Sequence, residues 1–132
     1  MDIDTGNAHD VDTAGTGWFI GFSPWTKPSV QGLRHVPDSE PVTGMTVKWY
    51  RHPAGQEGGN KPVSTGRTMS ILVTDGARFE IDFCMSPDFT GDVRTVVLTR
   101  EGDFAAWGEG LQHRWRCIRE ATIATVRWTP AP

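Results

Sequence analysis

The sequence predicts an all-β fold organised as one domain. Short apolar runs of strand length recur along the chain, and glycine- and proline-rich turns separate them; the 132 residues include 15 Gly and 9 Pro. Phe79, Ile81 and Phe83 alternate with polar neighbours, as expected of a strand with one buried face. No helical periodicity, internal repeat or linker is evident. The length suits one ordinary domain with one core.

Eight strands are expected, seven of them in the last two thirds of the chain. Residues 1–16 are polar, which predicts a disordered tail, and residues 17–22 (GWFIGF) are expected to form the first strand. Residues 23–44 carry four prolines and predict a long arm that wraps the domain, caps a pocket or swaps onto a neighbour. Residues 45–132 are expected to form a β-barrel. Its seven strands are predicted at residues 45–52, 68–74, 77–83, 93–100, 103–107, 113–118 and 121–128.

Turn residues separate these strands. Asp75 and Gly76 join two strand-like runs, and this dipeptide predicts a tight β-hairpin because its residues tolerate positive φ. Further turns are expected at residues 101–102, 108–110 and 119–120. Strands at this spacing predict a sandwich, jelly roll or small barrel.

Composition excludes several functional classes. The formal net charge of −3 gives no electrostatic reason to bind nucleic acid or an anionic membrane, and no apolar run reaches bilayer length. The polar N-terminus does not have the pattern of a secretory signal. Cys84 and Cys117 lack metal-site or redox spacing, which predicts buried free thiols in a cytoplasmic protein. No nucleophile elbow, phosphate loop or dinucleotide fingerprint is present.

Three segments carry a resemblance to a known family. Residues 102–115 (GDFAAWGEGLQHRW) run from Gly-Asp through an apolar strand and a turn to His113, and they resemble the second motif of the cupin superfamily. Residues 52–55 (HPAG) and 70–76 (SILVTDG) resemble the turn that opens the first cupin motif and the strand that closes it. Gly108 and Glu109 stand where that family usually has proline. The resemblance implies a cupin-type jelly roll, or double-stranded β-helix barrel.

The same resemblance raises the question of a metal, because many cupins hold one with three His and one Glu. Residues 56–69, where the first motif would supply His and Glu, contain no His, and their one carboxylate, Glu57, falls too early. Only His113 matches the family's ligand set. If one divalent ion (Zn, Fe or Ni) is bound, His113 and His52 are the predicted ligands, with Glu57 as a weak third. Such a set is incomplete, because three or four ligands are the norm.

His113 is the leading candidate for catalysis. Imidazole is the usual proton carrier near neutral pH. The alternative is a histidine that makes a structural hydrogen bond inside the barrel. Strand parity places His113, Trp115 and Cys117 on one face, so an aromatic wall is expected beside the imidazole. His52 is either the second member of an acid/base pair or a histidine on the rim.

Cationic and aromatic side chains are the candidates for substrate binding. Arg67 falls near the missing acidic ligand and is predicted to clamp a substrate carboxylate, unless it lies at a solvated strand end. Arg51 and Arg127 alternate with apolar residues, and the sequence does not decide which face they occupy. The sequence contains 6 Trp, most of them expected in the core. The predicted substrate-binding residues are Arg51, Arg67, Trp49, Trp107 and Trp115.

The sequence therefore predicts a small cupin enzyme that catalyses non-redox proton transfer. Isomerisation, epimerisation or cyclisation of a small aromatic or carbonyl compound is expected, in secondary metabolism, and the chain is similar to cupin epimerases of aromatic 2-oxo acids. A non-catalytic ligand-binding or sensor protein is the first alternative, and a metal-dependent oxygenase with unusual ligands is the second. A homodimer formed through the arm or a sheet edge is also expected.

Overall fold

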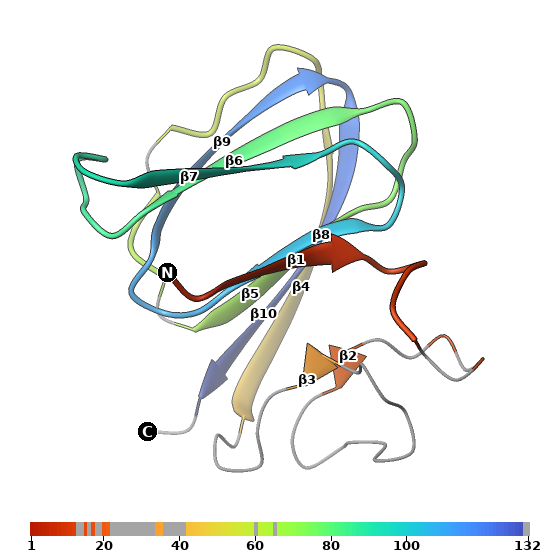
Figure 1. Ribbon diagram of the computed structural model, residues 1–132, viewed down its shortest axis with the longest axis horizontal. Helices are drawn as coiled ribbons and strands as arrows, with labels where there is room; N and C mark the ends of the chain where they lie inside the picture. Colours follow the sequence, from red (N-terminus) through yellow and green to blue (C-terminus); the bar gives the residue numbers. More distant parts are fainter. Residues whose placement is uncertain are drawn as a thin grey trace.

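Two antiparallel sheets make up the molecule (Figure 1). The computed structural model describes residues 1–12, 15, 17, 20–21, 34–35, 42–59, 61–64 and 66–130. The larger sheet has the order β1-β8-β5-β10-β4, the smaller has the order β7-β6-β9, and β2 and β3 form a short parallel pair. The strands are β1 (Ile3–Asn7), β2 (Ile20–Gly21), β3 (Arg34–His35), β4 (Val42–His52), β5 (Arg67–Leu72), β6 (Arg78–Cys84), β7 (Val93–Leu98), β8 (Asp103–Trp107), β9 (Gln112–Arg119) and β10 (Ala121–Pro130).

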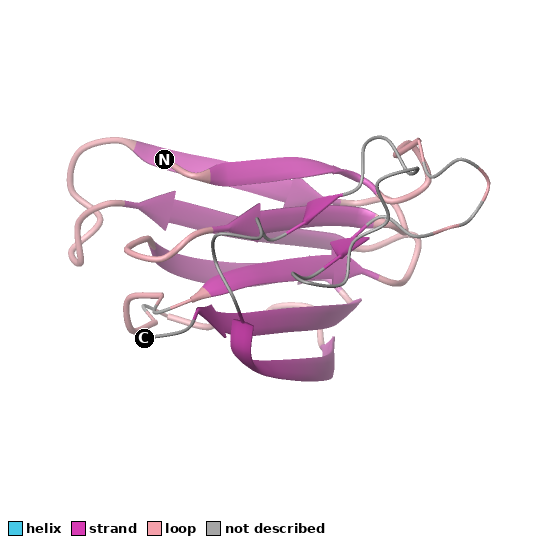
Figure 2. Cartoon of the chain, turned by 90° about the horizontal axis from the view of Figure 1, so that it is seen from below, coloured by secondary structure: helices cyan, strands magenta, loops and turns pink. Residues whose placement is uncertain are grey.

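The all-β prediction is confirmed: the described residues contain no helix, and so none that could span a membrane. The two sheets face each other and enclose the main core between them (Figure 2). On β6 the side chains of Phe79, Ile81 and Phe83 are at most 3% exposed, as their alternation predicted. Cys84 and Cys117 are free and buried, also as predicted. The remaining members of this core cluster are Leu72, Ala77, Val96, Leu98, Ala105, Trp107, Leu111, Ala121 and Ile123.

The turn at Asp75 and Gly76 does not join a hairpin, and that prediction is wrong. β5 pairs with β8 and β10, whereas β6 pairs with β7 and β9, so this turn carries the chain from one sheet to the other. Gly76 has a φ of 72°, the conformation for which glycine was expected. A tight turn fixes a change of direction but not the pairing partner: β5 pairs with β8 and β10, whereas β6 pairs with the next strand, β7, and with the more distant β9.

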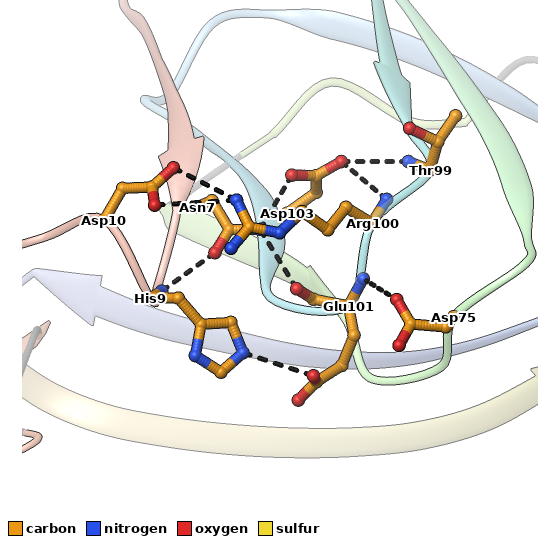
Figure 3. Close-up of polar contacts among 8 residues, drawn as sticks. All are labelled: Asn7, His9, Asp10, Asp75, Thr99, Arg100, Glu101 and Asp103. Atoms are coloured by element: carbon orange, nitrogen blue, oxygen red, sulfur yellow. Dashed lines mark hydrogen bonds and ion pairs between the residues drawn. The ribbon is translucent and has the colours of Figure 1, made fainter.

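The N-terminal segment is ordered where the sequence predicted disorder over residues 1–16, and that prediction is wrong for Ile3–Asn7. β1 pairs antiparallel with β8 at the edge of the larger sheet. Polar contacts at its end hold it there (Figure 3). The Asn7 side-chain amide donates to the Glu101 carbonyl at 3.0 Å and to Asp103 Oδ1 at 2.9 Å. Backbone pairing and specific hydrogen bonds therefore order a segment that has little apolar surface to bury.

The barrel begins slightly earlier than predicted, because β4 starts at Val42 and not at residue 45. Of the predicted first strand, residues 17–22, the structure places Ile20–Gly21 in β2. Most of the predicted arm lies outside the described residues, as do Trp18 and Trp25.

One irregular segment closes the side of the smaller sheet. We call residues 55–59 and 61–64 the strap. It runs beside β9 and makes backbone hydrogen bonds that extend the sheet by one irregular strand. The strap therefore forms one wall of the space between the sheets. The bonds run from Gly55 N to Cys117 O, from Cys117 N to Gln56 O, from Gly58 N to Trp115 O, from Lys61 N to His113 O and from Ser64 N to Leu111 O.

Candidate functional site

A cavity of about 390 Å³ lies between the sheets and the strap. This volume is within the range of pockets for small molecules. Three aromatic side chains, Phe79, Trp107 and Trp115, form apolar walls. The indole of Trp107 donates a buried hydrogen bond of 3.1 Å to the Ser64 hydroxyl, which ties this wall to the strap. The cavity therefore combines a flat apolar lining with fixed polar groups, as ligand sites commonly do.

The polar floor of the cavity follows from strand register. β5, β10 and β4 lie side by side, and every second residue of each points inward. Two rows of mainly polar side chains therefore cross the floor. Residues Ser70, Thr125 and Lys48 form the first row, and residues Thr68, Arg127 and Thr46 form the second.

His113 lines the cavity from β9, on the face that strand parity predicted. Its ring lies 5.2 Å from that of Trp107, centroid to centroid. Its Nδ1 is buried and has no hydrogen-bond partner in the described part of the chain. Burial, followed by the charges of Arg127, Lys61 and Lys48, lowers the pKa of His113 to about 4. The imidazole is therefore neutral at physiological pH.

His52 ends β4 and lines the same cavity, but protein contacts hold it more tightly. It is 5% exposed, and its ring lies 4.4 Å from Trp115 and 5.0 Å from Phe79. Its Nδ1 is 2.7 Å from Gln56 Oε1, so Nδ1 carries the proton that this amide oxygen accepts. Burial lowers the pKa of His52, and the hydrogen bond to Gln56 only partly opposes that shift.

Three cations line the cavity: Lys48, Lys61 and Arg127. Arg127 Nε donates to Thr68 Oγ1 at 3.0 Å, and the Lys61 ammonium lies 5.6 Å from the Trp115 ring centroid. The described lining residues include no Asp or Glu. The field inside the cavity is therefore positive, which is also why these side chains lower the histidine pKa values.

Three of the five predicted substrate-binding residues lie elsewhere, and their predicted positions are wrong. Arg67 points away from the cavity and pairs with Asp2 at 2.6 Å. Arg51 is on the outer face of β4, where it pairs with Glu120 at 3.0 Å. Trp49 shares that face and is 68% exposed. Strand parity explains these three positions: the residue next to each of them along its strand faces the cavity, so its own side chain points to the other face of the sheet. The predicted positions of Trp107 and Trp115 are those observed.

Sequence reasoning missed Lys48 and Lys61 and left the face of Arg127 undecided. Two of the three lysines of the chain line this cavity. A signal for Lys48 was present, since it lies on the same parity as His52 on one strand. Lys61 had no such signal, because it lies in the irregular strap.

The side chains of the cavity do not fit a divalent metal. Glu57, the weak third candidate ligand, is exposed on the strap and does not line the cavity. Among the described residues no group of three or more His, Cys, Asp and Glu side chains could hold an ion. His52 commits Nδ1 to Gln56, and the three cations would repel a second positive charge. The ligand set predicted from His113 and His52 is therefore incomplete in space as well as in sequence.

The fold and the site define a class: a small β-barrel protein with an internal cavity of about 390 Å³. No family model matches the chain, and no curated protein matches it in sequence. Solved structures match its fold, and they include a cupin domain, so the chain has the cupin fold that its motifs indicated.

Three of these structures show the range of the likeness. A conserved protein of unknown function from Streptococcus pyogenes matches with a TM-score of 0.55 and 19% identity over 68% of each chain. HEPD from Streptomyces albus, with 2-hydroxyethylphosphonate and Fe(II) bound, matches with a TM-score of 0.53 and 10% sequence identity over 66% of this chain and 18% of its own. The cupin domain of Drosophila melanogaster CENP-C matches with 0.51 and 13% over 61% of this chain and 59% of its own. These identities show the fold alone.

Proposed function

We propose that this protein binds a small organic molecule in the cavity and transfers a proton on it without redox chemistry, with His113 as the base. One observation carries the proposal: a buried, neutral imidazole lines an aromatic-walled cavity, and its Nδ1 has no hydrogen-bond partner among the described residues. A histidine with a structural role would have its ring nitrogens paired. The buried Nδ1 of His113 lacks such a partner in the described part of the chain, so no structural hydrogen bond at this atom accounts for an imidazole that lines the cavity.

The residues around His113 suit abstraction of a proton next to a carbonyl group. The imidazole accepts the proton, the electron pair of the broken C–H bond forms the C=C bond of an enolate, and the negative charge moves to the carbonyl oxygen. Arg127, Lys48 and Lys61 stabilise that charge. Return of a proton from the imidazolium to the same face of that carbon gives exchange with solvent, whereas delivery to another atom gives an isomerisation and delivery to the opposite face gives an epimerisation.

The negative charge that develops on the substrate also favours the protonated form of the base. The enolate offsets the positive field that lowers the pKa of His113, so the imidazolium becomes easier to form as the reaction proceeds. His52, with Nδ1 held by Gln56, presents Nε2 as a second acceptor. Once Nε2 has taken up a proton from solvent, His52 can deliver that proton to carbon from another direction, which an epimerisation requires.

Solvent deuterium exchange into aromatic 2-oxo acids tests the proposal. Phenylpyruvate and indolepyruvate are incubated in D₂O with the wild-type protein, and incorporation is followed by NMR against a protein-free blank. We expect His113→Gln to lower the exchange rate by roughly a hundredfold or more, the usual contribution of a general base. His9→Gln is the matched control, because that imidazole is exposed and pairs with Glu101 far from the cavity.

The binding-only alternative gives a different result. Acids that bind but exchange no faster than the blank, in wild type and His113→Gln alike, would show a ligand-binding protein and overturn the catalytic proposal. Thermal unfolding of each variant separates loss of chemistry from loss of fold.

A further inference from the structure

The charges of the cavity are unbalanced, and this imbalance identifies the kind of ligand. Lys48, Lys61 and Arg127 line the cavity, and in the described part of the chain no carboxylate forms an ion pair with any of them. The two histidines beside them add no compensating negative charge. Like charges in a partly enclosed space repel each other at a cost that surrounding water only partly screens.

This arrangement differs from that of seven other arginines, Arg51, Arg67, Arg78, Arg100, Arg114, Arg116 and Arg119, which are held by carboxylates or backbone carbonyls. Arg51, Arg67 and Arg100 each pair with an acidic side chain, although all three are partly or largely exposed. The cations of the cavity are an exception, and they surround a space large enough for a ligand.

Thr68 prepares Arg127 for such a ligand. Thr68 is fully buried, and its hydroxyl accepts a hydrogen bond from Arg127 Nε. The guanidinium is therefore oriented through Nε, and its two terminal nitrogens are not used in this contact. The two terminal NH₂ groups remain for a planar oxyanion, which arginine binds through paired hydrogen bonds. Lys61 contributes from the strap, where its ammonium lies near the Trp115 ring.

We infer that the ligand is an organic anion, with its oxyanion group held by Lys48, Lys61 and Arg127 and its apolar body packed against Trp107 and Trp115. A carboxylate, phosphate or phosphonate shares the chemistry that these cations recognise. The inference rests on the proposed use of the cavity as a ligand site, but it does not depend on catalysis. It makes Arg127 the specificity-determining residue and Thr68 the residue that positions it.

Binding of a matched anionic and neutral pair tests the inference. Indole-3-acetate and indole-3-acetamide have the same ring and nearly the same shape, and their binding to the full chain is measured by isothermal titration calorimetry at low salt. We expect the acid to bind about tenfold more tightly or better, since hydrogen bonds to charged groups contribute more than neutral ones. A comparison of the affinities for phenylphosphonate and phenylacetate then shows whether the site prefers a phosphonate or a carboxylate.

Variants assign the effect to the cavity. Arg127→Gln and Lys48→Gln are each expected to weaken binding of the acid by roughly tenfold or more and to leave binding of the amide unchanged. Thr68→Val is expected to weaken binding of the acid less than Arg127→Gln does. In a protein that already carries Arg127→Gln, Thr68→Val is expected to have no further effect. Arg51→Gln is the control, since Arg51 lies on the other face of the same strand as Lys48.

Several outcomes overturn the inference. They are equal affinity for acid and amide, an acid affinity that Arg127→Gln does not change, and no binding of any of these anions at millimolar concentration. A failed deuterium exchange is a separate result: if the acid still binds through Arg127, catalysis is excluded and the anion site stands.

Discussion

Two clusters of basic side chains, one on the outer face of the smaller sheet and one in the cavity, differ in how their charge is balanced. On the outer face of the smaller sheet, Arg116 donates to Glu80 at 2.7 Å and to Asp82 at 2.9 Å, and Arg114 donates to Asp82 at 3.0 Å. We call these four residues the outer ladder. Inside the cavity, Lys48, Lys61 and Arg127 have no such partners among the described residues.

The difference teaches what each cluster is for. In the outer ladder, burial raises the pKa of Asp82, but the Thr95 hydroxyl and the two guanidinium groups outweigh it and hold that pKa below its usual range. The charges are satisfied within the fold, so the ladder stabilises the sheet. The inner cations have no ion-pair partner among the described residues, and Lys48 and Arg127 are exposed, so they repel one another slightly and are available for binding.

Removal of Asp82 gives the largest expected change in stability. Asp82→Ala leaves Arg114 and Arg116 without their shared carboxylate and Thr95 without its acceptor. We expect a loss of about 3 kcal/mol in the free energy of unfolding, at the lower end for a buried ion pair because both arginines are partly exposed. Urea denaturation at neutral pH measures it. Asp92→Ala, in an exposed turn, is the control, and an equal effect in both variants would contradict the role of the ladder.

The acid limb of stability should depend on His113. Its pKa is about 4 in the folded protein and near 6.5 when unfolded, so the unfolded chain takes up the proton first as the pH falls. Stability is therefore complete above pH 6.5 and decreases toward pH 4. His113→Leu removes this contribution, worth on the order of 2 kcal/mol between pH 7.5 and 4.5.

Comparing unfolding free energies at those two pH values isolates the effect, because losses of packing cancel in the difference. His9→Gln should keep the wild-type pH dependence. If His113→Leu also kept it, the imidazole would not be buried in its neutral form.

The smallest expected change is a gain. In the double variant Lys48→Gln with Arg127→Gln, relief of repulsion among the inner cations should raise the free energy of unfolding by a few tenths of a kcal/mol at low salt, and less at high salt. Thermal unfolding at two ionic strengths measures it. A clear loss of stability would show that these cations have structural partners, and the contrast with the outer ladder would fail.

Much of the fold could be predicted from the sequence, because alternation identifies strands and their faces locally. β6 and β9 behaved as predicted, with Phe79, Ile81 and Phe83 inside and with His113 and Trp115 lining the cavity. Pairing partners could not be predicted in the same way. The Asp75–Gly76 turn crosses between sheets because β5 and β6 each pair with strands far away in the sequence.

The candidate site was harder to predict because its strand reverses the usual rule. On β4 the apolar residues Val47 and Trp49 face outward and are exposed, whereas Lys48 and His52 face the cavity. An assignment that puts apolar residues inside would therefore select the wrong face of β4, and the sequence alone did not decide which face Arg51 occupies. Polar inner faces are typical of binding sites, and only the register across β5, β10 and β4 reveals one here.

Gly58 gives the strap a consequence for how a ligand meets the site. A methyl group at this position would lie 2.3 Å from the Trp115 indole, so only a hydrogen atom fits between them. The indole ring cannot turn unless the strap moves away from it at Gly58. The backbone N–H of Gly58 donates a hydrogen bond to the carbonyl of Trp115, which opposes that movement. The strap therefore holds Trp115 in place before a ligand arrives, and recognition at this wall selects molecules by shape without adapting to them.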